Sequence, residues 1–343
     1  MKTFYFVLLI AMALLTLPSA GHAAAAETEK ERHDRLVEGA KKEGSVVFYG
    51  SITASESESL RKVFESKYPF LKTTQFRAGS DSLLQKVLTE ARAGRREADV
   101  FNIRSFEGNV LVERGLFAKY ASPHSRFYRD DFKDREGHWT SFYMNPATIG
   151  YNTKLVPRAE APKDWADLLD PKWKGQMVMD REETEWFANM LKFTGREKGL
   201  QYMRRLATQG VTFRAGHSLM AQLVAAGEFK LGVVLYTPRM EIMKKSGAPI
   251  EWVRANPVIA YHYVVGVAAH APHPNAARLF VDFLLSKEGQ ELLVKTARVP
   301  VRSDVKADPP ALVEGVNMMA SDISLAKDYK KYYDEYREVF RVP

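Results

Sequence analysis

The sequence predicts an α/β protein built from two lobes that are joined by extended strands. Short apolar runs rich in β-branched and aromatic residues alternate with amphipathic stretches at helical spacing. Two longer extended segments, "TSFYMNPATIGYNTKLV" and "VIAYHYVVGVAA", separate groups of these units. Their position predicts strands that cross between two lobes, with a cleft between the lobes. The chain length also suggests about two domains.

The first residues have the pattern of a secretory signal peptide. Lys2 precedes an apolar run from Phe4 to Leu17, and small residues follow as far as Ala23. The run is shorter than the roughly 20 residues that a membrane-spanning helix needs, and no later segment is long enough. We therefore expect a signal peptide over residues 1–23, cleavage after Ala23 and a periplasmic location. An uncleaved membrane anchor is the alternative.

Composition narrows the classes of function. The chain of 343 residues has no cysteine, so it lacks the disulfide framework of small secreted domains. Its formal net charge of +8 comes from Lys and Arg residues spread along the chain, which indicates solvated faces and no nucleic-acid partner. A modest positive field still favours an anionic solute.

Residues 24–143 predict the first part of lobe 1. The run "SVVFYGS" is a buried strand that enters a loop, and the helix after it ends at Pro69. Strands are also predicted for "KTTQFRAGS" and "ADVFNI", with a helix between them that Ser80 or Ser82 can cap. This strand–helix–strand–helix–strand order implies a parallel sheet with helices on both faces.

Residues 144–257 predict lobe 2, and residues 258–343 return to lobe 1. In lobe 2 a short Trp-rich helix precedes the strand "QMVMD", a helix follows over 183–193, and "GVTFRAGHSLMAQLVAAGEFKLGVVLY" repeats the order of strand, capped helix and strand. After the second crossing, "PNAARLFVDFLLSKEGQELLVKTA" predicts two consecutive helices. The aromatic stripe of "DYKKYYDEYREVF" predicts another C-terminal helix that packs on the lobes.

Six stretches carry a resemblance to a known family. They are "EGSVVFYGS", "ADVFNI", "IGYNTKLV", "DWADLLDPKWKGQ", "GHSLMAQLVAAGEF" and "APHPNAARLFVDFLLSKEGQELL". Together they resemble the type II periplasmic substrate-binding proteins of ABC importers, within the family that includes ferric-ion-binding proteins. The resemblance implies the type II fold, in which each lobe is a mixed sheet flanked by helices and hinge strands lie between the lobes. It also implies a monomer that captures a small solute by hinge closure and docks on an inner-membrane ABC permease.

Four strand-to-helix corners are candidate positions for binding an anion. Ligands of open α/β sheets lie beyond the carboxyl ends of the strands, where the free N–H groups of helix N-termini attract oxyanions. Each corner taken alone also fits a plain helix cap. The corners are Tyr49–Gly50–Ser51, Gly79–Ser80–Asp81, Glu182–Glu183–Thr184 and Gly216–His217–Ser218. The predicted ligand-binding residues are Tyr49, Ser51, Ser80, Arg104, Glu183, Thr184, His217, Tyr236 and Arg239.

The strand ends favour an oxyanion-bearing organic or phosphate-type solute over iron. For iron binders the resemblance implies two adjacent tyrosines with a histidine and a glutamate from lobe 1. Here Tyr236 stands alone, Ile52 and Thr53 are found where a histidine is expected, and Arg104 where an acid is expected. A guanidinium pairs with carboxylate or phosphate, as Arg104 and Arg239 would. Ferric iron or an iron chelate is the alternative, with Tyr236 and Glu183 as candidate ligands; no other cofactor is expected.

The stretch "DREETEW" contains four acids, Asp180, Glu182, Glu183 and Glu185. Acids at a helix start interact favourably with the macrodipole and can cap its N–H groups, which explains about two of them. The excess is suited to a metal or to the cationic end of a zwitterionic solute. No G-x-S-x-G, H-E-x-x-H or P-loop motif occurs, so we expect no enzyme. A solute sensor that docks on a membrane receptor is the second alternative.

Overall fold

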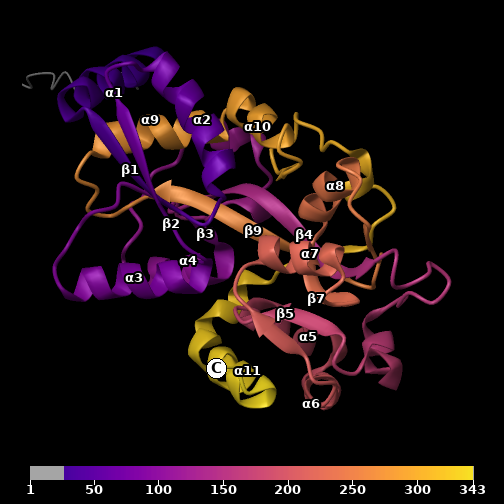
Figure 1. Cartoon of the computed structure of the whole chain (residues 1–343). Helices are drawn as coiled ribbons and strands as arrows, with labels where there is room; N and C mark the ends of the chain where they lie inside the picture. The colour runs from indigo at the N-terminus through magenta and orange to yellow at the C-terminus, as the bar shows by residue number, and fades with distance from the viewer. Residues whose placement is uncertain (1–26, 343) are drawn as a thin grey trace, which may run out of the picture.

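A single mixed sheet runs through the whole molecule. The computed structural model describes residues 27–342, so the predicted signal peptide over residues 1–23 lies outside the described part. The sheet that these residues form has 11 strands, and its main path has the order β2-β1-β3-β9-β4-β7-β5-β6. One half of this path belongs to lobe 1 and the other half to lobe 2, with β9 and β4 between them (Figure 1). No helix within residues 27–342 is long and apolar enough to cross a membrane.

Lobe 1 contains the parallel strands that the sequence predicts. Strand β1 (Ser45–Gly50) pairs in parallel with β2 (Lys72–Arg77) and with β3 (Val100–Arg104). Helices α3 and α4 cover one face, while α9 and α1 cover the other (Figure 1). The helices of this lobe are α1 (Glu29–Glu43), α2 (Ala54–Lys67), α3 (Ser80–Arg92), α4 (Ser105–Glu113), α9 (Pro274–Leu285) and α10 (Lys287–Val294). The prediction of two consecutive helices after Pro274 is confirmed.

Lobe 2 repeats this arrangement with different strands. Strand β5 (Met177–Asp180) pairs in parallel with β6 (Thr212–Arg214) and with β7 (Leu231–Tyr236). Its helices are α5 (Thr184–Thr194), α6 (Arg196–Ala207), α7 (His217–Ala226) and α8 (Thr237–Lys245). Helix α5 matches the helix predicted over 183–193 and ends at Gly195, whose φ of 83° suits a residue without a Cβ atom.

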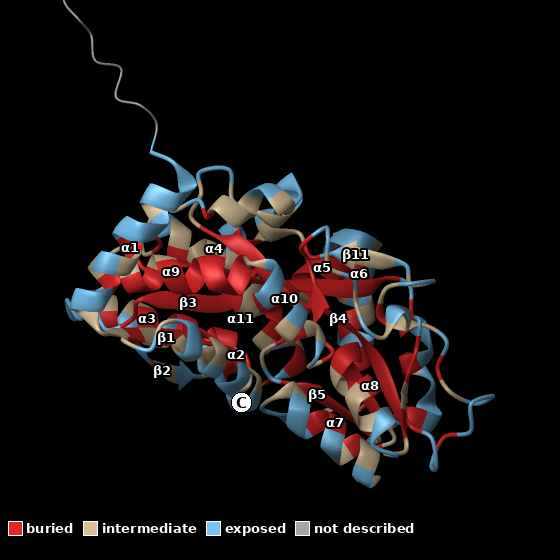
Figure 2. Cartoon of the chain, turned by 90° about the horizontal axis from the view of Figure 1, so that it is seen from above, coloured by how far each residue is buried: buried red, intermediate tan, exposed pale blue. Residues whose placement is uncertain are grey.

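Two long strands connect the lobes. Strand β4 (Thr140–Asn152) pairs with β9 (Val258–Val267) and β7, while β9 also pairs with β3, so each strand belongs to both halves of the sheet. These strands are the extended crossings predicted from sequence. Every residue of β9 is buried, and so is almost every residue of β4, which is largely red in Figure 2. Three short strands complete the sheet: β8 (Ile250–Trp252), β10 (Val299–Pro300) and β11 (Met318–Ala320).

The C-terminal segment contacts both lobes. Strand β11 pairs with β9, and helix α11 (Tyr329–Phe340) follows. The Tyr329 hydroxyl donates to Asp81 of lobe 1 at 3.0 Å, and the Tyr336 hydroxyl donates to the carbonyl of Asp180 in lobe 2 at 2.9 Å. The aromatic stripe predicted for this helix therefore packs on protein. Short 3-10 helices occupy Pro123–Phe127, Asp130–Phe132, Trp165–Leu169, Pro171–Trp173, Pro310–Leu312 and Ile323–Asp328.

Candidate functional site

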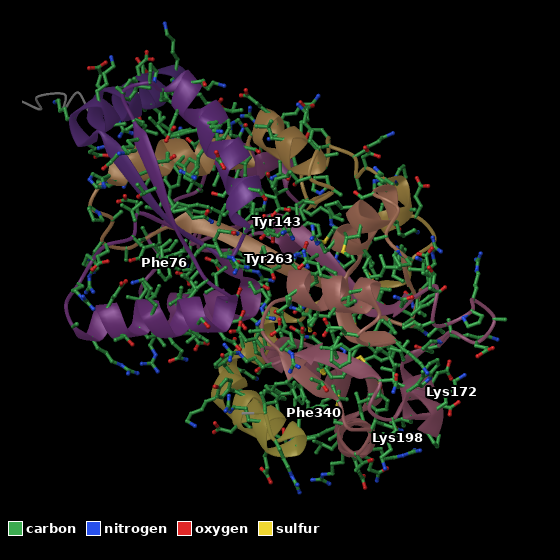
Figure 3. The ribbon with its side chains drawn as sticks, in the orientation of Figure 1. Phe76, Tyr143, Lys172, Lys198, Tyr263 and Phe340 are labelled. Atoms are coloured by element: carbon green, nitrogen blue, oxygen red, sulfur yellow. The ribbon has the colours of Figure 1, made fainter. Side chains whose placement is uncertain are left out.

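A cavity of about 200 Å³ lies between the lobes, at the carboxyl ends of β1, β3, β5 and β7. This is the edge where open α/β sheets bind ligands. Drug-sized ligands occupy sites of roughly 300–1,000 Å³, so the cavity suits a smaller solute. Tyr143 of β4 and Tyr263 of β9 lie at the centre of the molecule and line it (Figure 3).

The lining combines residues from both lobes and from the crossing strands. Lobe 1 contributes Ser51, Thr53, Arg77, Gly79, Ser80, Ser82 and Arg104. Lobe 2 contributes Asp180, Arg181, Glu182, Ala215, Gly216, His217, Ser218 and Tyr236. Tyr143, Asn145, Tyr263 and Arg298 complete it. A solute in this cavity would therefore be enclosed by both lobes.

Five of the residues predicted to bind ligand lie in this lining: Ser51, Ser80, Arg104, His217 and Tyr236. The others lie elsewhere. The Tyr49 hydroxyl donates to Glu90 and Glu97 at 3.1 Å each, Glu183 and Thr184 are buried behind the wall, and Arg239 lies within α8. Solute contact by any of these residues stays a prediction.

Two helices begin at the cavity without a side-chain cap. Gly79 precedes α3 in lobe 1 and Gly216 precedes α7 in lobe 2; neither glycine has a side chain that could cap its helix, and the Gly216 amide donates to the Asp180 carboxylate at 2.8 Å. The prediction that Ser80 or Ser82 caps α3 is wrong. The Ser80 hydroxyl accepts from the Arg104 amide at 3.1 Å, and the Ser82 hydroxyl donates to Glu182 at 3.0 Å. The uncapped N–H groups give both helix starts a positive partial charge.

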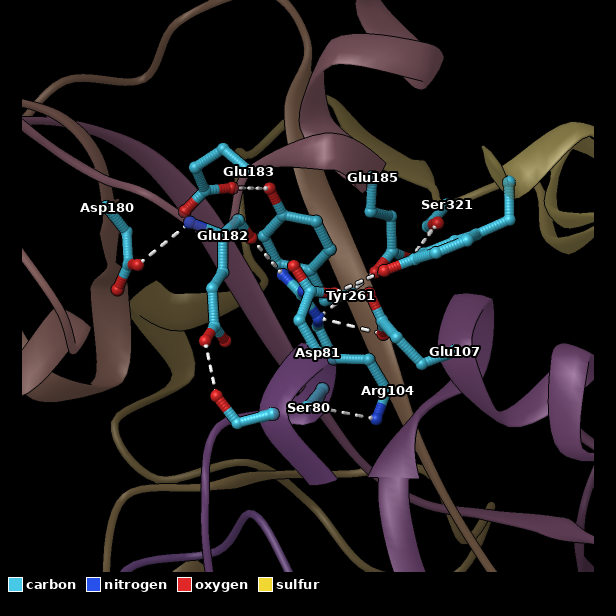
Figure 4. A network of polar contacts seen from close by, with 12 residues as sticks. Ser80, Asp81, Arg104, Glu107, Asp180, Glu182, Glu183, Glu185, Tyr261 and Ser321 are labelled. Carbon is cyan, nitrogen blue, oxygen red and sulfur yellow. Dashed lines mark hydrogen bonds and ion pairs between the residues drawn. The ribbon is translucent and has the colours of Figure 1, made fainter. Parts of the chain in front are cut away.

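Arg104 is surrounded by protein acceptors. Its guanidinium donates to Glu107 at 2.8 and 3.1 Å, to Asp81 at 3.4 Å, and to the carbonyl of Glu182 at 3.0 Å (Figure 4). Its Nε also lies 3.6 Å from a carboxylate oxygen of Glu185. Because these groups come from both lobes, Arg104 joins the lobes. Its guanidinium is already occupied by acceptors, which favours a structural role over the predicted contact with a solute oxyanion.

The four acids of "DREETEW" take part in this network. Glu183 precedes α5 but does not cap it with a side-chain hydrogen bond, and Glu185 lies in the first turn of this helix. These acids can therefore interact favourably with the helix macrodipole, but the predicted capping of N–H groups does not occur. Asp180 accepts from the backbone amides of Glu182 and Gly216 at 3.0 and 2.8 Å. Burial raises the pKa of Glu183 well above its ordinary value and the pKa of Glu185 to about 7. The interface between the lobes thus holds more carboxyl groups than positive charges.

The lobe 2 wall of the cavity is aromatic around Tyr236. Its ring stacks on His217 with centroids 3.8 Å apart, and its hydroxyl lies 2.9 Å from the Tyr263 hydroxyl. Burial raises the pKa of Tyr236 well above its ordinary value, so the phenol is neutral at physiological pH. Burial also lowers the pKa of His217 to about 4. This wall can donate hydrogen bonds and can stack.

Sequence reasoning missed Tyr143, Tyr263, Arg77, Arg181 and Arg298 as cavity residues. Arg298 forms a two-pronged pair with Glu56 at 3.0 and 2.8 Å, and its guanidinium lies 4.8 Å above the Tyr143 ring. Arg77 is the last residue of β2, and Arg181 directly follows β5. This position at the carboxyl end of a strand is the one signal in the sequence that could have identified them. Within residues 27–342, no group of three or more His, Asp or Glu side chains is arranged to hold a metal ion.

Comparison with known proteins places these features in a family. A family model described as "Bacterial extracellular solute-binding protein" matches residues 97–323. An uncharacterized protein of Haemophilus influenzae is 31% identical over 271 residues, which cover 75% of this chain and 77% of that protein. A putative 2-aminoethylphosphonate-binding periplasmic protein of Salmonella typhimurium is 27% identical, with 58% and 66% covered.

A solved structure has the same fold. The periplasmic binding protein AfuA from Actinobacillus pleuropneumoniae, with fructose-6-phosphate bound, superimposes with a TM-score of 0.80 and 25% identity, covering 88% of this chain and 99% of that chain. It shares the arrangement of two lobes that the sheet order shows here. The chain therefore belongs to the bacterial extracellular solute-binding protein family.

Proposed function

We propose that this protein is the substrate-binding component of an ABC importer and that its solute is a small organic phosphate, phosphonate or similar oxyanion. Family membership supports the first part. The named relatives support the second part, because one is named for a phosphonate and the similar structure contains a sugar phosphate. Both compounds present a phosphorus oxyanion on a small organic body.

One observation carries the choice of an oxyanion. The starts of α3 and α7 reach the same cavity from opposite lobes, at Gly79 and Gly216; the Glu182 carboxylate lies beside the start of α3, which leaves the start of α7 for an oxyanion. Free backbone N–H groups at a helix start are suited to phosphate oxygens. Arg77 and Arg181 also line the cavity, both are exposed, and neither forms an ion pair with another described residue. Arginines of this kind can pair with two phosphate oxygens at once.

Closure of the lobes would complete this site. Across the cleft, Arg104 of lobe 1 donates to the carbonyl of Glu182 in lobe 2, and Ser82 donates to the carboxylate of Glu182. These contacts hold α3 and the β5–α5 corner together, so that the solute is shielded from water. Rotation about β4 and β9 would break them and release the solute.

The cavity supports binding without chemistry. Among the described residues, no hydrogen bond joins a cavity serine to His217, whose Nδ1 instead lies 3.3 Å from the carbonyl of Val234. Ser80 accepts a backbone hydrogen bond, so its hydroxyl lacks the neighbouring base that a nucleophile needs. We propose further that the chain is exported with cleavage after Ala23, acts as a periplasmic monomer and docks on an inner-membrane permease.

Calorimetry on the mature protein tests the choice of solute. Fructose-6-phosphate and 2-aminoethylphosphonate are titrated into the wild type, Arg77→Ala, Arg181→Ala and the control Arg92→Ala, which removes an exposed arginine of α3 outside the cavity. Loss of a charge-assisted pair should weaken binding by about 10- to 100-fold in the two cavity variants and leave the control unchanged. Absence of binding by any phosphate or phosphonate, with native mass spectrometry showing another class of solute, would refute the proposal.

Ferric iron is a second candidate because three tyrosines line the cavity, whereas the sequence predicted one. They are Tyr143, Tyr236 and Tyr263, and the rings of Tyr143 and Tyr263 stack with centroids 4.7 Å apart. Ferric iron favours anionic oxygen donors, so all three phenols would have to lose protons. Addition of ferric ion should then produce a visible tyrosinate-to-iron absorption band that Tyr236→Phe weakens or abolishes. A flat spectrum eliminates this candidate.

A further inference from the structure

Glu182 places a carboxylate from lobe 2 against the helix start of lobe 1. One of its carboxylate oxygens lies 2.5 Å from the position that a Cβ atom on Gly79 would occupy, so only glycine allows this approach. The other oxygen accepts from the Ser82 hydroxyl at 3.0 Å. Gly79, Ser82 and Glu182 all line the solute cavity, and Figure 4 shows the Glu182 side chain in the polar network. A carboxylate therefore projects into the space that a solute would enter.

Of the two acids that line the cavity, Asp180 and Glu182, Glu182 has more unused hydrogen-bonding capacity. Ser82 is the single donor to its carboxylate within residues 27–342, whereas an ionised carboxylate can accept about four hydrogen bonds. Asp180, the other acid of the lining, accepts from two backbone amides. Glu183 and Glu185 lie outside the lining, where the Tyr261 hydroxyl donates to Glu183 at 2.8 Å and the Ser321 hydroxyl donates to Glu185. A further donor on Glu182 would have to come from the solute or from water.

The charge of Glu182 is not balanced by its surroundings. Burial, together with the nearby charges of Asp81 and Asp180, raises its pKa above the ordinary value even though Arg104 acts in the opposite direction. Arg104 binds the main-chain carbonyl of Glu182 and directs its other donors to Glu107 and Asp81. A cationic group beside the Glu182 carboxylate would offset this cost.

We infer that Glu182 binds a cationic group of the solute, so that the cavity selects zwitterions in which an ammonium lies a few bonds from a phosphorus oxyanion. The inference rests on the proposed function, since the oxyanion end is assigned to the start of α7 and to Arg77 and Arg181 of the lining. A plain alkyl phosphonate would leave the Glu182 carboxylate without a cationic partner and would place its own negative charge close by. Glu182 is therefore the residue expected to determine specificity.

Two probes that differ by one ammonium group test this inference. 2-Aminoethylphosphonate and ethylphosphonate are titrated by calorimetry into the wild type, Glu182→Gln, Ser82→Ala and the control Glu228→Gln, which removes an exposed acid of lobe 2 outside the cavity. In the wild type the aminoalkyl compound should bind about 10- to 100-fold more tightly. In Glu182→Gln this ratio should fall to near one, with ethylphosphonate binding more tightly than it does to the wild type.

The Ser82→Ala variant removes the hydroxyl that donates to the Glu182 carboxylate, so the ratio of affinities for 2-aminoethylphosphonate and ethylphosphonate should fall in part. The Glu228→Gln control should keep the wild-type ratio. Circular dichroism and melting curves confirm that each variant is folded. An unchanged ratio in Glu182→Gln, or equal binding of both probes by the wild type, overturns the inference and leaves the proposed function standing. If neither these phosphonates nor fructose-6-phosphate binds, both the proposed function and the inference fail.

Discussion

Replacing Arg104 with methionine separates a structural role from a solute-binding role. The substitution keeps a similar volume but removes a guanidinium that is 2% exposed. Three carboxyl groups, those of Asp81, Glu107 and Glu185, then lose the positive charge that lies within 3.6 Å of each of them. No other cation bonds to these groups among the described residues, so the variant leaves buried charges without a partner.

The size of the effect follows from that loss. Removal of one partner from a buried ion pair typically costs about 3–5 kcal/mol of folding free energy. Part of this loss should be recovered at low pH. Burial already raises the pKa of Glu107 and of Glu185, so the folded state holds these protons more tightly than the unfolded state. A raised carboxyl pKa favours folding below the unfolded value and costs stability as pH rises through the folded value. The destabilisation should therefore shrink by at least about 1 kcal/mol between pH 7.5 and pH 5.

Urea unfolding followed by tryptophan fluorescence measures the free energy of unfolding of Arg104→Met and of the wild type at pH 7.5 and pH 5. The control Arg92→Met should stay within about 0.5 kcal/mol of the wild type. Calorimetry with 2-aminoethylphosphonate is run on the same preparations. If Arg104→Met unfolds with wild-type free energy at both pH values but loses phosphonate binding, the structural assignment is refuted and the sequence-based assignment of Arg104 to the solute is restored.

The remaining predictions concern the wall, the acids and the hinge. Tyr236→Phe should weaken phosphonate binding by less than about tenfold in calorimetry, because it removes one neutral hydrogen bond; a larger loss would indicate a charged phenolate. Glu185 has a folded pKa of about 7 against 4.5 for an ordinary glutamate, so wild-type stability relative to Glu185→Gln should fall by on the order of 3 kcal/mol from pH 4.5 to pH 8 in urea titrations. Parallel curves of unfolding free energy against pH for the wild type and Glu185→Gln would contradict the raised pKa of Glu185. Saturating phosphonate should reduce the radius of gyration in small-angle scattering through rotation about β4 and β9, and an unchanged radius would argue against hinge closure.

Local signals explain why the helices and the parallel strands could be predicted. The helix near 183–193 is encoded by apolar periodicity and a terminal glycine, and the helices after Pro274 by the proline and the apolar face. The same signals fail at α3, where Ser80 and Ser82 have suitable side chains for a cap but bond to Arg104 and Glu182. A cap prediction depends on the absence of stronger partners, and such partners come from distant parts of the chain.

The cavity residues on the crossing strands illustrate a different limit. Alternation of polar and apolar residues identifies the faces of a strand only when one face is exposed. Since β9 is buried throughout, its sequence does not distinguish Tyr263, which lines the cavity, from His262, which contacts Phe132 with ring centroids 4.9 Å apart and lies outside the lining. The Arg104 guanidinium donates to the main-chain carbonyl of Glu182, 78 positions further along the chain, and lies 3.6 Å from the Glu185 carboxylate. No local pattern in "DREETEW" identifies either contact.

The two ends of the described chain belong to different lobes, and this makes the protein suitable as an optical sensor. Helix α1 packs on α9 of lobe 1, whereas Phe340 at the end of α11 packs on Phe213 of lobe 2 with ring centroids 6.0 Å apart. The sequence contains no cysteine, so single cysteines introduced near the start of α1 and the end of α11 would be the only thiols available for labelling. A donor and an acceptor dye at these positions would report lobe closure as a change in energy transfer, without an insertion into either lobe.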